Sequence, residues 1–478
     1  MAETLKDKTA RGLFWGMLNS STTQVLNAVI GILLGRLLTP AEYGIVGVLA
    51  IFTAVAGALQ ASGFTQGLIN LKAPTAKDYN SVFWFNISVS AAIYIILFAS
   101  APLIAVFFHQ PCLVGVSRLV FLCLPISALG IAFYAFMLKN MMNRELAIAN
   151  LLALIVSGLT GIVLALQGFS YWSLAWQQIV YIVVSNIARL YFVSWRPSLR
   201  IDFTPVRRMY SFCIRLMITN IINSLNQHLL TFVFGSLFPI SSVGNYSQAN
   251  KWNMMASSTI SGMIGQVAQP VLASVNEERD REARVFRKLM RFTAFLSFPA
   301  MFGLALVARE FILLTIGERW TDSIPLLQVL CVGGAFLPFY TLYQNLTVSN
   351  GRSNIYMWCN IAQIVIQLIL ILAFYRQGIM AVVCACSVFT ILWLTVWQAI
   401  AHRLIGISLW DILKDIVPFL VVAYATMLAT YQLTAGITNH LLLLLARVAL
   451  AAILYGGTMK LLKAKVMDEC IRFILRKN

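Results

Sequence analysis

The sequence predicts an all-α polytopic membrane protein with about fourteen transmembrane helices. Hydrophobic residues make up 60% of the 478-residue chain and charged residues only 11%. Apolar runs of helix length recur along the whole chain and are joined by short connections. Soluble proteins are about half apolar and about a quarter charged, so a soluble core could not absorb this surplus. Hydrocarbon is therefore the solvent that we expect for most of the chain.

A helix needs roughly 20 apolar residues to cross the bilayer. Fourteen segments meet this requirement: 13–35, 43–69, 81–108, 114–138, 146–166, 171–193, 210–235, 243–274, 290–308, 323–347, 355–375, 378–401, 412–433 and 439–459. The longest polar connections are expected at 194–209 and 275–289. Both are too short to hold a nucleotide-binding or catalytic domain.

Basic residues give the chain a net charge of +18, and their placement predicts its orientation. With the N-terminus in the cytoplasm, cytoplasmic segments hold 26 of the 35 Lys and Arg residues, and external loops hold four. Because such a bias sets the orientation of membrane proteins, both termini are expected in the cytoplasm. We interpret the basic stretch 279–291 as a connector that faces anionic lipid, and not as a nucleic-acid site.

Two stretches of the chain resemble each other at a constant offset of 200 residues. Residues 19–27 match 219–227, residues 35–37 match 235–237, and Gly44 matches Gly244. Six helices separate the copies, so both halves should cross the membrane in the same direction. We expect them to be related by an axis along the membrane normal.

The repeated helices carry polar side chains spaced four residues apart, which places each set on one helical face. The two sets are Asn19, Thr23 and Asn27 in the first helix, and Thr219, Asn223 and Gln227 in the seventh. An amide left without a partner in lipid costs several kcal/mol. The two faces are therefore predicted to border a wet cavity. Hydrogen bonding between neighbouring helices is the alternative.

Lys251 is the most informative charged residue, because it lies about 12 Å into its helix at 1.5 Å per residue. Arg215 lies one or two turns into the seventh helix, and all seventeen Asp and Glu residues are expected in loops or at helix ends. Cations and amides suit an anionic, hydroxyl-rich ligand, whereas an exporter of organic cations needs a buried carboxylate. The alternative for Lys251 is snorkelling or pairing with Glu42.

These arguments define a set of candidate substrate-binding residues: Lys251, Arg215, Asn19, Thr23, Asn27, Asn223, Gln227 and Gln248. No catalytic residue, metal ligand or cofactor is predicted. The four histidines have no Cys, Ser or Asp partner at motif spacing, and Walker and dinucleotide loops are absent from the sequence. Cys384 and Cys386 are two residues apart on a helix and make a poor metal pair.

The stretch 31–44, GILLGRLLTPAEYG, resembles the first-helix signature of the polysaccharide transporter family, within the multidrug/oligosaccharidyl-lipid/polysaccharide flippase superfamily. Stretches 244–251 and 269–274 resemble its eighth-helix pattern, and GERW at 317–320 and NGR at 350–352 also match. The similarity covers most of the chain and is strongest to Wzx-type lipopolysaccharide and exopolysaccharide flippases.

The resemblance implies two six-helix lobes, residues 1–194 and 210–401, joined by a cytoplasmic connector at 195–209. Residues 402–478 would add helices 13 and 14 and a basic cytoplasmic tail. It implies transport by alternating access in a bacterial inner membrane. The implied cargo is an oligosaccharide on an undecaprenyl pyrophosphate carrier. The coupling ion stays open, with a proton and a sodium ion as the candidates. Two alternatives stay open: a drug or organic-cation antiporter of the same superfamily, and a membrane-embedded glycan polymerase or acyltransferase.

Overall fold

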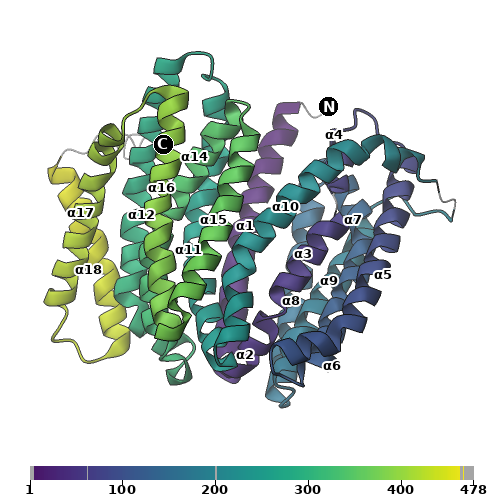
Figure 1. Cartoon of the computed structure of the whole chain (residues 1–478), viewed down its shortest axis with the longest axis horizontal. Helices are drawn as coiled ribbons and strands as arrows, with labels where there is room; N and C mark the ends of the chain where they lie inside the picture. Colours follow the sequence, from purple (N-terminus) through teal and green to yellow (C-terminus); the bar gives the residue numbers. More distant parts are fainter. Residues whose placement is uncertain (1–4, 62, 200–201, 463–466, 468–478) are drawn as a thin grey trace. The chain divides into compact units, whose positions relative to one another are not determined.

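The computed structural model describes residues 5–61, 63–199, 202–462 and 467 (Figure 1). Some side chains within the helices, that of Arg215 among them, lie outside the described set. The elements are α1 (Leu5–Leu37), α2 (Pro40–Gly47), α3 (Ala50–Ala61), α4 (Phe64–Asn70), α5 (Ala76–Phe107), α6 (Leu113–Phe121), α7 (Cys123–Lys139), α8 (Asn143–Leu166), α9 (Tyr171–Phe192), α10 (Thr204–Leu237), α11 (Ile240–Ala273), α12 (Arg279–Thr315), η1 (Glu318–Trp320), α13 (Ser323–Gly334), α14 (Leu337–Ser349), α15 (Ser353–Phe374), η2 (Tyr375–Gln377), α16 (Ile379–Ile405), α17 (Leu409–Leu433) and α18 (His440–Leu461).

The predicted all-α membrane architecture is confirmed, whereas the count of fourteen spans is not. Within the described residues, ten helical segments are long and apolar enough to cross a membrane. The other four expected spans are helices of sufficient length, namely α1, α9, α10 and α11 with 33, 22, 34 and 34 residues. Three of these four, α1, α10 and α11, are the helices that carry the repeated polar residues and Lys251.

The polar connector expected at 275–289 is largely helical, which corrects the sequence-based boundary. Helix α12 begins at Arg279, so that only residues 274–278 separate it from α11. Arg, Lys and Glu favour helix despite their polarity. Arg287 in this stretch pairs with Asp415 of α17 at 2.6 Å. Part of the basic stretch therefore contacts another helix of the protein, in addition to any contact with lipid.

The helices form two compact units, residues 1–244 (the N-terminal unit) and residues 245–478 (the C-terminal unit). Helix α10 belongs by its packing to the N-terminal unit, where it lies along α3 and α5. The sequence-based boundary at 195–209 follows the repeat, and the boundary at 244 follows the packing.

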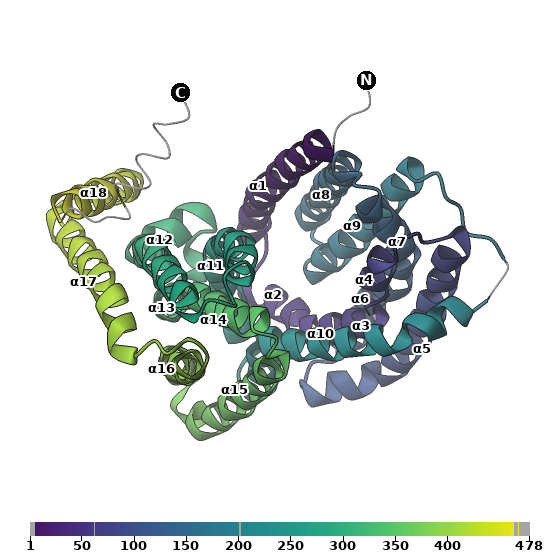
Figure 2. The ribbon, with the colours of Figure 1, turned by 90° about the horizontal axis from the view of Figure 1, so that it is seen from above.

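In the N-terminal unit, α8 packs between α1 and α9, and α9 also packs on α7 (Figure 2). Helices α1 and α8 run in parallel, because Arg144 lies over the ring of Trp15 at 5.8 Å near their starts and Ile30 lies against Gly158 further along. A side chain at Gly158 would overlap Ile30, so this glycine allows the two helices to approach closely.

Basic side chains hold together the end of the N-terminal unit at which α1 begins. We call it the N-terminal end. Lys139, at the end of α7, donates hydrogen bonds to the backbone oxygens of Ile69 and Leu71 at 2.7 and 2.6 Å. The loop between α9 and α10 is joined to α5 by the Lys77–Asp202 ion pair at 2.6 Å. Hydrogen bonding from Lys77 holds the pKa of Asp202 well below its usual range.

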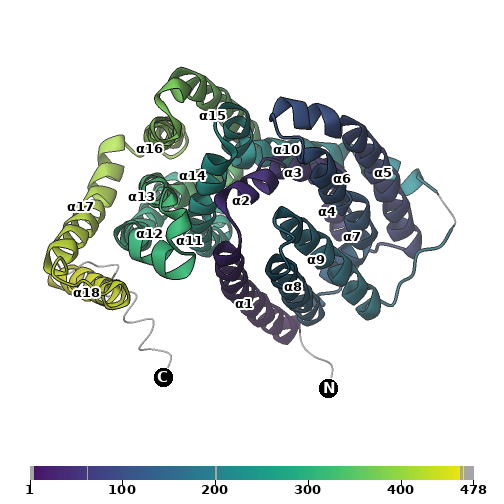
Figure 3. The same ribbon diagram turned by 90° about the horizontal axis from the view of Figure 1, so that it is seen from below.

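The internal repeat is visible at the opposite end of the same unit, where α2 joins α1 to α3 (Figure 3). Helix α1 ends at Leu37 and α10 at Leu237, while α2 begins at Pro40 and α11 at Ile240. All these boundaries keep the offset of 200 residues that the sequence showed. The sequence similarity therefore corresponds to equivalent helix breaks.

In the C-terminal unit, α12 packs against α13, α14, α17 and α18. Arg447 of α18 and Glu310 of α12 form a buried ion pair at 2.8 Å, with side chains only 8% and 3% exposed. The expectation that every acidic residue lies in a loop or at a helix end is therefore wrong for Glu310. The reason is that α12 continues to Thr315, beyond the predicted end at residue 308.

Candidate functional site

A cavity of about 590 Å³ lies in the N-terminal unit, a volume in the range of small-molecule binding sites. Five helices line it, and its residues are Thr23 and Asn27 of α1, Thr53 and Gly57 of α3, Cys123, Leu124 and Ser127 of α7, Leu154 and Ser157 of α8, and Gln177, Gln178, Tyr181 and Ile182 of α9. No lining residue is charged. The cavity therefore offers amides and hydroxyls to an uncharged ligand.

The amides of this cavity are available to a ligand, whereas its hydroxyls are partly occupied. Ser127 and Ser157 each donate to a backbone oxygen one turn earlier, at 2.9 and 3.1 Å. Within the described residues, the side-chain amides of Asn27, Gln177 and Gln178 have no hydrogen-bond partner. Each amide can donate and accept, so these three groups are the ones most able to bind hydroxyls.

The first polar stripe predicted from the sequence contributes to this cavity. Thr23 and Asn27 line it, and Asn19, one turn away, accepts a hydrogen bond from the hydroxyl of Thr23 at 3.4 Å. The second stripe, on α10, does not reach the cavity: neither Asn223 nor Gln227 is a lining residue. Substrate binding by these residues stays a prediction.

Two predicted cations remain without a tested role. The side chain of Arg215, in α10, lies outside the described part of the structure. Lys251 is half-buried in α11, with its ammonium 5.4 Å from the ring centre of the adjacent Trp252. Among the described residues, no carboxylate lies within ion-pair distance of Lys251. Glu42 instead accepts hydrogen bonds from the backbone and hydroxyl of Thr39, at 2.6 and 2.9 Å.

Buried polar groups without protein partners are concentrated near Lys251 along α11. Gln248 is 1% exposed, and neither atom of its amide has a hydrogen-bond partner in the described residues. The side-chain oxygens of Asn245, Ser247 and Asn253 also have no hydrogen-bond partner in the described residues. Buried polar atoms in proteins are almost always paired with protein or water. These side chains therefore form a polar region inside the C-terminal unit.

Most of the cavity could not be predicted from the internal repeat. Gln177 and Gln178 belong to α9, which is not one of the two repeated helices whose polar faces predicted the site. Adjacent glutamines in a membrane helix are a usable signal, since uncompensated amides are rare there. Ser127 and Ser157 give no such signal, because serines commonly bond to their own helix backbone.

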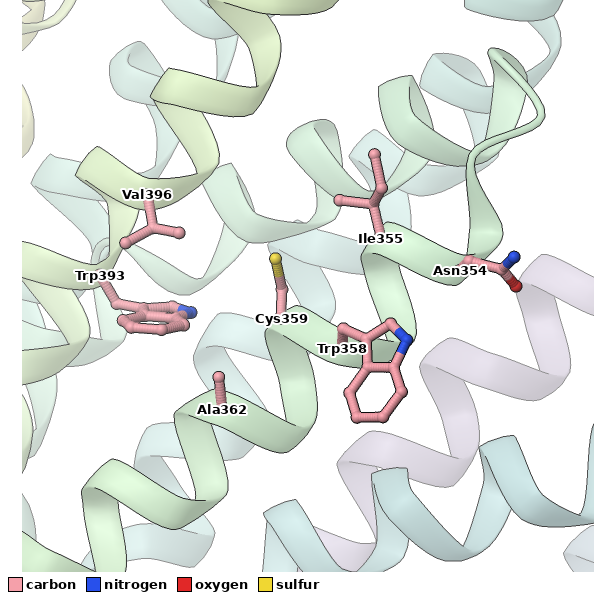
Figure 4. A pocket seen from close by; sticks show the side chains of 7 residues that line it. All are labelled: Asn354, Ile355, Trp358, Cys359, Ala362, Trp393 and Val396. Carbon is pink, nitrogen blue, oxygen red and sulfur yellow. The ribbon is translucent and has the colours of Figure 1, made fainter.

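A second hollow, of about 330 Å³, lies between α15 and α16 in the C-terminal unit (Figure 4). Its lining is dominated by apolar side chains: Asn354, Ile355, Trp358, Cys359, Ala362, Trp393 and Val396. Trp358 is 64% exposed. Such a surface offers few groups that could hydrogen-bond a sugar, so the N-terminal cavity is the better candidate for polar cargo.

The fold and the cavity define a polytopic helical membrane protein with an uncharged polar cavity inside a helix bundle. The chain belongs to the polysaccharide biosynthesis protein family, whose model matches residues 33–325. It is 26% identical over 337 residues to the lipopolysaccharide biosynthesis protein WzxC of Escherichia coli (strain K12), covering 69% of this chain and 68% of the relative. The resemblance noted in the sequence is confirmed.

One further relative and two solved structures are also similar to this chain. The succinoglycan biosynthesis transport protein ExoT of Rhizobium meliloti (strain 1021) is 25% identical over 339 residues, covering 70% of this chain and 68% of the relative. The fold is similar to that of the lipid II flippase MurJ in an inward closed conformation, with a TM-score of 0.72 and 12% identity over 94% of this chain and 99% of that one. An inward-facing multidrug resistance MATE family transporter of the MOP superfamily has a TM-score of 0.63 and 16% identity, covering 80% of this chain and 94% of that one.

Proposed function

We propose that this protein is a flippase that moves oligosaccharides linked to undecaprenyl pyrophosphate from the cytoplasmic to the periplasmic leaflet of a bacterial inner membrane. The observation that carries the proposal is the uncharged cavity lined by amides and hydroxyls, in a chain of the polysaccharide biosynthesis family. Sugars present many hydroxyls, and amides can both donate to and accept from them. Relatives named for lipopolysaccharide biosynthesis and succinoglycan transport support glycan cargo.

In this scheme both termini are cytoplasmic and transport proceeds by alternating access of the two repeat-related lobes, 1–194 and 210–401. The polar stripe of α1 contacts the sugars within the cavity, and the polar stripe of α10 contacts the cargo outside it. Lys251 and Arg215 bind the anionic part of the cargo, because ammonium and guanidinium groups form charge-assisted hydrogen bonds with phosphate.

Export of organic cations is less well supported, because the cavity has no carboxylate among its lining residues. Buried acids do occur elsewhere, and arginines neutralise two of them. Asp415 pairs with Arg287 at 2.6 Å, and Glu310 pairs with Arg447 at 2.8 Å. A carboxylate already paired in this way is a poor site for a second cation.

The proposal is tested in a strain that lacks the gene, by measuring lipid-linked oligosaccharide in the inner membrane. Loss of the protein should cause this precursor to accumulate, and the intact gene should clear it. Asn27→Leu and Gln178→Leu should leave the precursor accumulated at normal protein level. Gln432→Leu, an exposed glutamine of α17, is the control that should complement fully. Unchanged precursor in the deletion strain would reject the proposed function.

A further inference from the structure

Arg189, near the end of α9, is a half-buried cation without an acidic partner among the described residues. Its guanidinium lies over the ring of Tyr134 at 5.1 Å and donates to the side-chain oxygen of Asn150 at 3.4 Å. Its Nε atom is buried without a hydrogen-bond partner. Most of its donors are therefore unused, which is costly for a cation in this setting.

The neighbours of Arg189 lie on the helix faces that line the cavity. On α9, Ile182 of the cavity and Arg189 are seven residues apart, so they share one face. On α8, the cavity residue Leu154 lies four residues after Asn150. On α7, Ser127 of the cavity and Tyr134 are again seven apart. Three helices therefore place this cation directly beyond the cavity, about 10 Å closer to the N-terminal end at 1.5 Å per residue.

A buried hydroxyl adds a second unused donor to the same face of α9. Ser185 lies between Ile182 and Arg189 and is 2% exposed, and its oxygen has no hydrogen-bond partner in the described residues. A guanidinium with free N–H groups beside a free hydroxyl can bind the oxygens of a phosphate. An uncharged polar cavity adjoins it on one side.

We propose that Arg189, aided by Ser185, binds the phosphate of the cargo at the N-terminal end of the cavity, while the sugars occupy the cavity itself. The inference rests on the proposed function. It adds a phosphate contact and the orientation of the cargo in the cavity. The pyrophosphate lies toward the end where α9 finishes, and the sugars lie toward the middle of the bundle.

Arg118 provides a matched control, because its surroundings resemble those of Arg189 but lie elsewhere in the N-terminal unit. Its guanidinium stacks on Phe98 at 4.3 Å, and its Nε is also buried without a partner. It belongs to α6, which contributes no residue to the cavity lining. Substitution of either arginine therefore removes a positive charge and a stacking contact. The two arginines differ in their position relative to the cavity.

The experiment measures binding of farnesyl pyrophosphate to the full-length protein in phosphatidylcholine nanodiscs, by thermophoresis. The wild type should bind, and Arg189→Gln should weaken binding about tenfold to a hundredfold, the equivalent of one or two charge-assisted hydrogen bonds. Arg189→Lys should recover part of the affinity, and Arg118→Gln should stay within about twofold. Size-exclusion profiles and melting temperatures show that each variant is folded.

The outcomes separate the two proposals. A wild type that does not bind farnesyl pyrophosphate would contradict the proposed function, and with it the site that depends on it. Binding that is equal in wild type and Arg189→Gln would overturn the assignment of Arg189 alone. A parallel titration with phosphatidylglycerol tests the other source of phosphate. If Arg189→Gln removed only the response to this lipid, the residue would be a headgroup site and the proposal would be wrong.

Discussion

The backbone of Gly44 lies directly against the carbonyl group of Ile240, and a Cβ atom on this glycine would overlap it. The converse contact also exists, because a Cβ on Gly244 would overlap the carbonyl of Pro40. Positions 40 and 240 are equivalent in the repeat, as are 44 and 244. Gly44 thus contacts the residue at position 240, and Gly244 contacts the residue at position 40. Such reciprocal contacts are expected for a two-fold relationship. The repeat found in the sequence therefore corresponds to a symmetric crossing of helices.

This crossing predicts that alanine is not tolerated at either glycine. Gly44→Ala or Gly244→Ala should lower the free energy of unfolding by about 1–3 kcal/mol, the usual cost of overpacking. Thermal unfolding of the purified protein in detergent measures the effect. Gly262→Ala in α11 is the control, because nothing lies within 4 Å of the added methyl group. Equal melting temperatures for all three variants would mean that the backbones do not touch.

The buried pair Glu310–Arg447 is predicted to fix α18 to α12. Arg447→Ala should destabilise the protein by about 3–5 kcal/mol, because it leaves the buried carboxylate of Glu310 without a partner. The exposed pair Arg281–Glu278, at 2.9 Å with side chains 56% and 62% exposed, is the comparison. Removing Arg281 should cost at most about 1 kcal/mol. Similar losses at both sites, measured by thermal unfolding, would argue against a buried pair.

Lys251 is predicted to be required for transport but not for folding. A lysine at this depth costs about 2.5–3.5 kcal/mol on insertion scales, so its removal should not lower protein level. Lys251→Ala should abolish clearance of lipid-linked oligosaccharide, and Lys251→Arg should retain part of it because the charge is kept. Lys414→Ala is matched, since Lys414 also lies over a tryptophan ring, at 5.7 Å, and should have no effect. Full export by Lys251→Ala would show that the amides suffice.

The charge bias predicts the topology of the chain in the membrane. Reporter fusions at Gln110, Phe238 and Gly436 should read as periplasmic, and fusions at Ala73, Ser198 and Glu277 as cytoplasmic. An alkaline phosphatase and green fluorescent protein pair reports the two sides independently. A cytoplasmic signal at Phe238 would contradict the parallel orientation of the two repeats.

Sequence patterns alone predicted the membrane-embedded helical fold, the family, and the repeat with its offset of 200 residues. These depend on composition, apolar period and local motifs, all of which are properties of the chain read in order. The paired glycines, Gly35 with Gly235 and Gly44 with Gly244, kept this spacing on both sides of the helix break, so the equivalent breaks were predictable.

The packing of the helices in three dimensions sets which polar residues share a cavity and which charges are paired. Gln178 and Thr23 come from distant helices, and their meeting depends on packing that no sequence spacing encodes. Glu310 looked like a residue of an external loop until α12 proved longer than its apolar core. Arg189 resembled an ordinary arginine at a helix end, and became a candidate only when Tyr134, Asn150 and the cavity were found on the same faces. Local pattern sets each helix, but the partner of each buried polar group is set by how the helices pack against one another.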